Sequence, residues 1–381
     1  MPKKLPNYLF VLTLIWLLPA CDGPPAPVAP SPQPPTEVVQ PTPPPTKAVQ
    51  PTPSPTERVQ STTTTPPTVS TTVPVPTPTE PAAPATDLPA ELVFIPDPGI
   101  RVRLATEPNA AVAEDGTVYL FYNDKSENTI GQRVVAEAAD GLNFDAPTPI
   151  RNDQSHPYDP WRVQLPDGTW RKYRFDIENQ NVISLSSDDG IQFQPDDGVR
   201  FPLSESDNGT FGIHDEYVDN AGGVVMLYIG DMGGVNNVRL AYSPPGDNGL
   251  NFTLEDADPL GDAAAGGGKN SFVDPRTTLL PDGRRRLILM WQGEGPAPPL
   301  RAQGTIVSFI TEDGHKFTQE PGVRLSYDDF TEFEVVSLND PVVVPLADGR
   351  YRMYVAALIK IGSDEYEWGI VSATTPGSND Q

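Results

Sequence analysis

A short repeat made of an acidic residue, a proline and a later Asp-Gly pair constrains this chain more than any other feature. Asp159-Pro160 is followed at eight residues by Asp167-Gly168. Asp-Gly between two β-rich runs is a strong hairpin signal, because a tight turn needs positive φ angles. The same spacing follows three further pairs, Glu107-Pro108, Asp274-Pro275 and Asp340-Pro341.

A fifth, more degenerate copy contains His214, Asp215 and Glu216, with Gly222-Gly223 in its turn. Each copy encodes a small antiparallel sheet whose apolar faces need covering by its neighbours. Repeats of this size, built from short strands and glycine turns, are typical of stacked or radial β-architectures. The chain is therefore predicted to form five sheets of one kind.

A second signature indicates that the five sheets close into a ring. Phe193 is followed by QPDDGVRF and Phe317 by TQEPGVRL, whereas Phe94, which precedes the first copy, is followed by IPDPGIRV. The last copy stops near Thr374 with no aromatic strand after it. Residues 92–103 are therefore expected to supply the missing outer strand, which removes two exposed sheet edges. The prediction is an all-β, five-bladed β-propeller closed by an N-terminal strand.

The first 21 residues have the features of an export signal. Lys3 and Lys4 precede a short apolar run, and the run ends in Leu18-Pro19-Ala20-Cys21. This ending resembles a bacterial lipobox, and Cys21 is the only cysteine in the chain. Residues 1–21 are thus predicted to be a lipoprotein signal peptide, with lipidation at Cys21. The protein would be exported and held by lipid on the outer side of the cytoplasmic membrane or on the cell surface.

Residues 22–88 are rich in proline and threonine and contain one decapeptide three times, ending at Gln40, Gln50 and Gln60. Such a segment cannot bury a core, so a disordered linker is expected. Residues 89–381 then form the propeller domain. The chain carries a net charge of −25, which disfavours nucleic acid as a partner. No cofactor or metal ligand set is predicted, and the sequence does not determine whether the channel holds an ion.

The inner strands of a propeller converge on a central channel, and the loops that lead into them form its mouth. Acidic side chains of every copy are therefore expected there, together with histidines and aromatic rings suited to stacking on sugars. The candidate ligand-binding residues are His156, Tyr158, Trp161, His214, Asp215, Asp274 and Asp340. For Asp274 and Asp340 a structural role is an alternative, because a residue that recurs in the blades can serve as a cap where each strand begins.

These blades resemble the five-bladed glycoside hydrolases, namely the arabinanase and β-xylosidase group with its invertase and levansucrase relatives. The resemblance spans residues 92–374 and implies a general base in the first blade, an orienting carboxylate in the second and a general acid in the third. Matched blade by blade, these are Glu107, Asp159 and Glu216. Two positions depart from the family pattern: the first is Glu where the family has Asp, and the third lies in His-Asp-Glu-Tyr.

Two functions are consistent with these features. The first is a membrane-tethered, extracytoplasmic glycoside hydrolase that acts on oligo- or polysaccharides through acid and base carboxylates in the channel. The second is a non-catalytic surface propeller that binds glycans or proteins. A converging acid and base favour the enzyme, whereas aromatic platforms without them favour the binding protein.

Overall fold

The computed structural model describes residues 92–126, 131–176, 178–203, 215–231, 236–261, 271–292 and 304–377. All of them belong to one compact unit, Pro81–Gln381. The predicted signal peptide with Cys21, the predicted linker and His214 lie outside the described residues. In the described part of the chain, no helix has the length and apolar character needed to cross a membrane.

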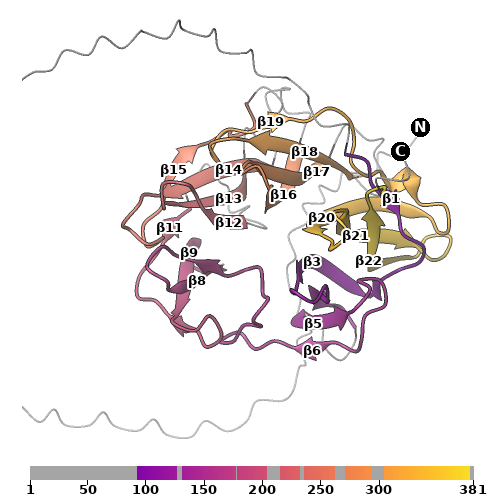
Figure 1. Cartoon of the computed structure of the whole chain (residues 1–381), viewed down its shortest axis with the longest axis horizontal. Helices are drawn as coiled ribbons and strands as arrows, with labels where there is room; N and C mark the ends of the chain where they lie inside the picture. The colour runs from indigo at the N-terminus through magenta and orange to yellow at the C-terminus, as the bar shows by residue number, and fades with distance from the viewer. Residues whose placement is uncertain are drawn as a thin grey trace, which may run out of the picture. The chain divides into compact units, whose positions relative to one another are not determined.

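The described residues form five antiparallel sheets arranged around a centre, with β3, β12, β16 and β20 nearest to it (Figure 1). The bounds follow by blade. Blade 1 has β3 (Ala105–Val112), β4 (Val118–Asp124), β5 (Gln132–Ala138) and β6 (Thr148–Pro149). Blade 2 has β7 (Val163–Gln164), β8 (Trp170–Asp176), β9 (Asn181–Ser187), β10 (Gln194–Pro195) and β11 (Phe201–Pro202). Blade 3 has β12 (Asp215–Val218), β13 (Val224–Asp231), β14 (Asn236–Ser243) and β15 (Thr253–Asp256). Blade 4 has β16 (Ser271–Leu279), β17 (Arg285–Gln292), β18 (Thr305–Thr311) and β19 (Thr318–Gln319). Blade 5 has β20 (Val335–Pro345), β21 (Tyr351–Lys360), β22 (Tyr366–Thr374) and two N-terminal strands, β1 (Ile95–Pro96) and β2 (Val102–Arg103).

The predicted closure is confirmed. Both β1 and β2 run antiparallel to β22, with Ile95 opposite Thr374 and Val102 opposite Ile370. The first segment of the domain thus completes the sheet made by its last three strands. A five-bladed, all-β propeller results.

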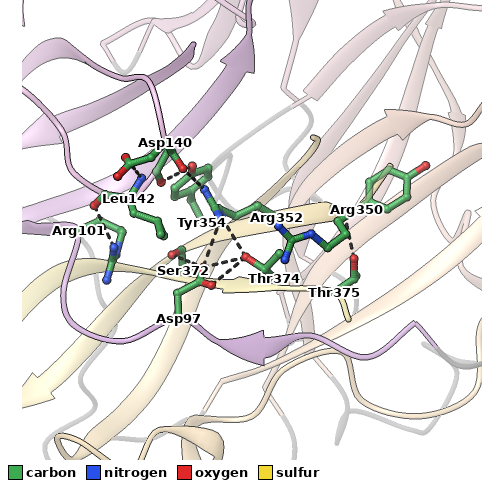
Figure 2. A network of polar contacts seen from close by, with 12 residues as sticks. Asp97, Arg101, Asp140, Leu142, Arg350, Arg352, Tyr354, Ser372, Thr374 and Thr375 are labelled. Atoms are coloured by element: carbon green, nitrogen blue, oxygen red, sulfur yellow. Dashed lines mark hydrogen bonds and ion pairs between the residues drawn. The ribbon is translucent and has the colours of Figure 1, made fainter. Parts of the chain in front are cut away.

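Polar side chains fasten this closure (Figure 2). The Asp97 carboxylate accepts hydrogen bonds from Ser372 (2.7 Å) and Thr374 (2.9 Å) of β22. Arg352 of β21 lies 3.4 Å from the same carboxylate and donates to the Asp140 carbonyl oxygen of blade 1 at 2.7 Å. One arginine therefore ties the added outer strand to its own sheet and to the next blade. We call this arrangement of acid, hydroxyl and arginine the edge clamp.

The edge clamp recurs in other blades and explains the closing signature. In blade 2, Asp196 accepts from Ser184 (2.5 Å) and Ser186 (2.6 Å) and pairs with Arg171 at 3.2 Å. In blade 4, Glu320 pairs with Arg286 at 2.7 Å and accepts from Ser308 at 2.6 Å. The glycine two residues after each acid adopts a positive φ, 80° at Gly99, 85° at Gly198 and 83° at Gly322. The signature is thus a structural motif of the outer strand.

The core is divided among the contacts between blades. Clusters of buried apolar side chains lie between blades 5 and 1, 2 and 3, 3 and 4, and 4 and 5. Where blade 1 meets the segment that leads into blade 2, charged and aromatic side chains make the contact instead. The candidate site begins at this contact.

Candidate functional site

Three of the acid–proline pairs share an irregular backbone. The acidic residue has a positive φ in each, 54° at Glu107, 58° at Asp274 and 51° at Asp340. At each acid–proline pair the register with the next strand shifts, as in a β-bulge. The shifts lie between Thr106 and Asn109 in β3, between Val273 and Arg276 in β16, and between Asn339 and Val342 in β20. Left-handed backbone costs a non-glycine residue roughly 1–3 kcal/mol, and such strain gathers at functional sites. The bulge turns three carboxyl groups out of the regular alternation of their strands.

The register of the inner strands separates two levels in the channel. Glu107, Asp274 and Asp340, the acids of these acid–proline pairs, define the upper level. Arg276 pairs with the fourth residue of β17, and Asp215 pairs with the fourth residue of β13. Asp215 therefore lies at the level of Arg276, two residues beyond the upper level. The blade-by-blade match from sequence had treated the third-blade acids as equivalent to the acid–proline pairs.

Asp274 and Asp340 meet at the upper level. The Asp340 backbone N–H donates to the Asp274 carboxylate at 3.1 Å. Burial raises the pKa of Asp274 to about 6, and the charge of Glu107 adds to the shift while the Asp340 N–H and Arg276 oppose it. Burial, followed by the charges of Asp274 and Glu107, raises the pKa of Asp340 well above its ordinary value. Near neutral pH this pair therefore favours holding a proton.

Glu107 completes the upper level from blade 1. Its half-buried carboxylate accepts a hydrogen bond from Asn123 Nδ2 at 2.6 Å. Because its charge contributes to the raised pKa of both Asp274 and Asp340, the three groups interact electrostatically. A carboxylate beside carboxyl groups with raised pKa values is a pairing that acid–base chemistry can use.

Asp159 behaves differently from the other acids. Only 2% of it is exposed, and it pairs with Arg133 at 2.9 Å and Lys172 at 3.2 Å. The Ser155 hydroxyl and the Trp161 N–H also donate to it, at 2.5 and 3.1 Å. Burial alone would raise its pKa, but the two cations and these donors outweigh burial and hold the pKa at about 2. Asp159 is thus a fixed anion, suited to positioning other groups.

Trp161 lies between guanidinium groups of two blades. Arg133 of blade 1 lies 3.1 Å from the centre of its ring, and Arg276 of blade 4 lies 5.7 Å from it. Burial is the main reason that the pKa of Arg133 falls to about 10. Because these arginines come from different blades, the structure places Trp161 in the channel, as its candidate role requires.

The structure places His156 and Tyr158 against blade 1. Their rings each lie 4.7 Å from the ring of Tyr119, and Tyr158 stacks on it at 14°. Tyr119 pairs with Ala111, four residues beyond Glu107 on β3. Burial lowers the pKa of His156. The two residues are therefore neighbours of each other and of Tyr119 and form an aromatic group distinct from the upper carboxyl level.

The side chains of Asp215 and Glu216 lie on opposite faces of β12, toward different neighbouring blades. The Asp215 carboxylate accepts from the backbone N–H (2.9 Å) and hydroxyl (2.7 Å) of Thr277 in blade 4. Burial, with the charge of Glu216 among the lesser causes, raises the pKa of Asp215. Glu216 in turn acts electrostatically on Tyr173 of blade 2. Alternation along β12 therefore brings Asp215 to blade 4 and Glu216 to blade 2.

Sequence reasoning did not identify four polar residues of this site, namely Asn123, Arg133, Lys172 and Arg276. Arg133 and Lys172 lie on the third strand of blade 1 and the second strand of blade 2. No repeat marks their positions. Arg276 directly follows the Asp274-Pro275 pair. Its place in that repeat was therefore the one sequence signal that could have identified it as a site residue. Within the described ranges, no group of three or more His, Cys, Asp or Glu side chains is arranged to hold a metal ion.

Comparison with known proteins identifies the fold. Neither protein-family profiles nor curated proteins match the chain. Among solved structures, the RGII complex of BT0996 matches with a TM-score of 0.51 and 14% identity, over 74% of this protein and 93% of that one. A thermostable family-43 glycoside hydrolase matches with a TM-score of 0.49 and 12% identity, over 75% and 94%. The α-L-arabinofuranosidase PaAbf62A from Podospora anserina, in complex with cellotriose, matches with a TM-score of 0.46 and 13% identity, over 75% and 95%. At these identities the similarity is one of fold alone.

Proposed function

We propose that this chain is an extracytoplasmic glycoside hydrolase whose reaction takes place at the upper carboxyl level of the channel. The observation that carries the proposal is the meeting of acidic side chains from three blades at this level. The charge of Glu107 acts on Asp274 and Asp340, whose pKa values are raised mainly by burial. A carboxylate beside a carboxyl group with a raised pKa is the usual source of a paired base and acid.

The proposed chemistry is the transfer of a glycosyl group to water. Glu107, held by Asn123, accepts a proton from a water molecule whose oxygen attacks the anomeric carbon. A carboxylic acid donates a proton to the leaving oxygen as the glycosidic bond breaks. The anion Asp159 fixes Arg133, whose guanidinium covers the ring of Trp161. Asp159 is therefore a positioning residue in this proposal.

Trp161 and the group of Tyr119, His156 and Tyr158 are the aromatic candidates for sugar contact. Tyr158 is 38% exposed, which leaves part of its ring open to a ligand. Flat rings of this kind suit the apolar faces of sugars, and the substrate class proposed is therefore an oligo- or polysaccharide. We further propose that lipid on Cys21 and the linker of residues 22–88 tether the domain outside the cytoplasm.

The competing function is glycan binding without turnover, which the internal pairing of Asp159 with Arg133 and Lys172 favours. A fragment of residues 89–381 should be assayed for sugar release from aryl glycosides and from arabino- and xylo-oligosaccharides. We expect release by the parent fragment and a loss of at least about 100-fold in Glu107→Gln, the low end of the range for acid–base catalysis. Asp115→Asn is the control, since Asp115 caps the exposed turn of the same blade.

Two results would contradict the hydrolase proposal. One is glycan binding by the parent fragment with no sugar released from any member of the panel. The other is release that Glu107→Gln leaves at the rate of the Asp115→Asn control. Either result would favour the binding protein, because the upper carboxyl level would then have no chemical role.

A further inference from the structure

Arg133 and Trp161 form a fixed pair of hydrogen-bond donors in the channel. The Arg133 guanidinium lies 3.1 Å from the centre of the Trp161 ring and covers one face of the indole. Its Nη2 donates to the Asp159 carboxylate at 2.9 Å, and Lys172 pairs with the same carboxylate at 3.2 Å. Because the Ser155 hydroxyl also donates to Asp159, the carboxylate holds the guanidinium in one orientation.

This pair has donor capacity that the described residues do not use. Asp159 is the one described residue to which Arg133 donates, although a guanidinium carries several N–H donors. The Arg133 Nε is buried without a partner, while 27% of the side chain is exposed. Among the hydrogen bonds of the described ranges, Trp161 donates only through its backbone N–H, which leaves the indole N–H unused. The remaining donors match a ligand that supplies acceptors.

Positive charge gathers around the same pair. Arg133, Lys172 and Arg276 come from three blades and lie around Trp161 and Asp159. Burial is the main cause that lowers the pKa values of Arg133 and Lys172, and repulsion adds to it, since Arg276 acts on Arg133 and Arg133 acts on Lys172. Asp159 supplies one negative charge to this group of cations. A second anion between them would therefore be stabilised.

We propose that Arg133 and Trp161 form a subsite that binds the carboxylate of an acidic sugar, namely a uronic-acid residue of the bound glycan. The inference rests on the proposed function in that the ligand is a glycan, and it narrows the substrate class to glycans that carry uronic acid. A guanidinium suits this group because its planar fork can bind both oxygens of a carboxylate. Asp159 is then the positioning residue that holds Arg133 for the ligand.

Carboxyl groups near these cations set the conditions for binding. The charge of Glu107 acts on Arg133. Arg276 acts electrostatically on three carboxyl groups, those of Asp215, Asp274 and Asp340. When ionised, these groups compete with a ligand for the cations. Burial raises the pKa of Asp274 to about 6, whereas an unperturbed carboxyl group ionises near pH 4. At about pH 5 the ligand is therefore charged while part of the competing charge is removed.

Equilibrium binding tests the subsite without any turnover. The full-length protein is titrated at about pH 5 by calorimetry with trisaccharides of galacturonate and of glucuronate, with the methyl esters of both, and with xylotriose. The ester retains the shape of the acid and lacks its charge. We expect one of the acids to bind at least about tenfold more tightly than its own ester, the effect of one charge-assisted hydrogen bond.

Two variants and a control locate the preference. Arg133→Gln should abolish it, while Lys172 still pairs with the carboxylate that had held the guanidinium. Trp161→Phe keeps a ring beneath the guanidinium and removes the indole N–H, so it should weaken binding of the acid by about three- to tenfold. Arg284→Gln is the control, because Arg284 pairs with Asp282 in the outer turn of blade 4, and it should bind as the parent does. Melting temperatures verify that each variant is folded.

The outcomes separate this subsite from the hydrolase proposal. Equal affinity for acid and ester in the parent, or no binding of either, would overturn the subsite and leave the hydrolase to the release assay. A preference that Arg133→Gln retains in full would also overturn it, because another group would then bind the carboxylate. Selective binding of the acid, with no sugar released from acidic or neutral glycosides, would contradict the hydrolase and leave the subsite standing.

Discussion

At the scale of the residue, carboxyl groups of similar sequence context have different chemistry because their neighbours differ. Asp159 and Asp274 are both followed by proline, and both are nearly inaccessible to solvent. Arg133 and Lys172 pair with Asp159 directly, whereas Asp274 has no such pair among the described residues and is acted on by the charges of Arg276 and Glu107. The pKa values consequently diverge, to about 2 and about 6.

The raised pKa of Asp274 predicts how a neutral variant changes stability with pH. A carboxyl group whose folded pKa is about 6 binds more protons when folded than when unfolded, where its pKa is about 3.9. Folding stability is therefore lost as pH rises from about 4 to about 6. Asp274→Asn removes this loss. We expect the variant to gain on the order of 2–3 kcal/mol of unfolding free energy over the parent above about pH 7.

Urea unfolding of the two proteins at several pH values measures this difference. Near pH 4 the gain should shrink toward zero, since Asp274 is then protonated in the folded state and the unfolded carboxyl is about half protonated. An asparagine side chain can still accept the Asp340 N–H, so that hydrogen bond is retained. A constant difference across the pH range would contradict the raised pKa.

Residue chemistry was also the least predictable part of the site from sequence. Glu107 and Asp159 could be assigned to the channel because the acid–proline repeat marks them. The pairing of His156 and Tyr158 with Tyr119 could not be predicted, since Tyr119 is an ordinary strand residue without a repeat. The level of Asp215 was readable from spacing, because Asp215 lies seven residues before its turn glycine Gly222, whereas Asp274 lies nine before Gly283.

At the scale of the element, the edge clamp holds the outer strands of blades 2, 4 and 5. The Gly-Val-Arg sequences predicted where the outer strands lie, but not why those residues recur. The structure supplies a reason for the acid that precedes this sequence, because Asp97 binds Thr374 and pairs with Arg352 of β21, a buried arginine that joins two blades (Figure 2). A charged network between sheets depends on every member, because removing one partner leaves another buried and unpaired.

Arg352→Ala should therefore destabilise the domain by about 3 kcal/mol. Arg350→Ala is a matched control, because Arg350 adjoins the same strand and pairs with Asp348 of its own turn, with 39% of its side chain exposed against 7% for Arg352. Exposed pairs of that kind contribute about 0–1 kcal/mol. Unfolding free energies from urea titration compare the two. Equal losses would mean that the edge clamp contributes no more than a surface pair.

At the scale of the whole molecule, the ring was the most predictable feature. Each of the five hairpin repeats has apolar faces that neighbouring repeats must cover. The outer-strand signature before the first copy predicted that the N-terminal segment closes the ring. The pairing of β1 and β2 with β22 confirms both steps. Fold-level prediction succeeded because periodicity in sequence is preserved as symmetry in space. The site is harder to predict because it depends on where the blades differ.

The ring also explains how carboxyl groups far apart in sequence meet. Glu107, Asp274 and Asp340 come from the first, fourth and fifth blades, and closure makes the first and the fifth neighbours. If a glycan is cleaved at this upper carboxyl level, its scissile bond must bind there. The location of a bound sugar is therefore the decisive observation.

The measurement is a crystal structure of the Glu107→Gln variant with an uncleaved oligosaccharide identified by the activity screen. We expect a glycosidic oxygen within about 3 Å of an Asp274 or Asp340 carboxyl oxygen, the distance at which a proton can be donated. The side chain at position 107 should then lie on the other side of the anomeric carbon. A sugar whose glycosidic oxygen lies away from both carboxyl groups, or faces Glu216, would contradict cleavage at this level.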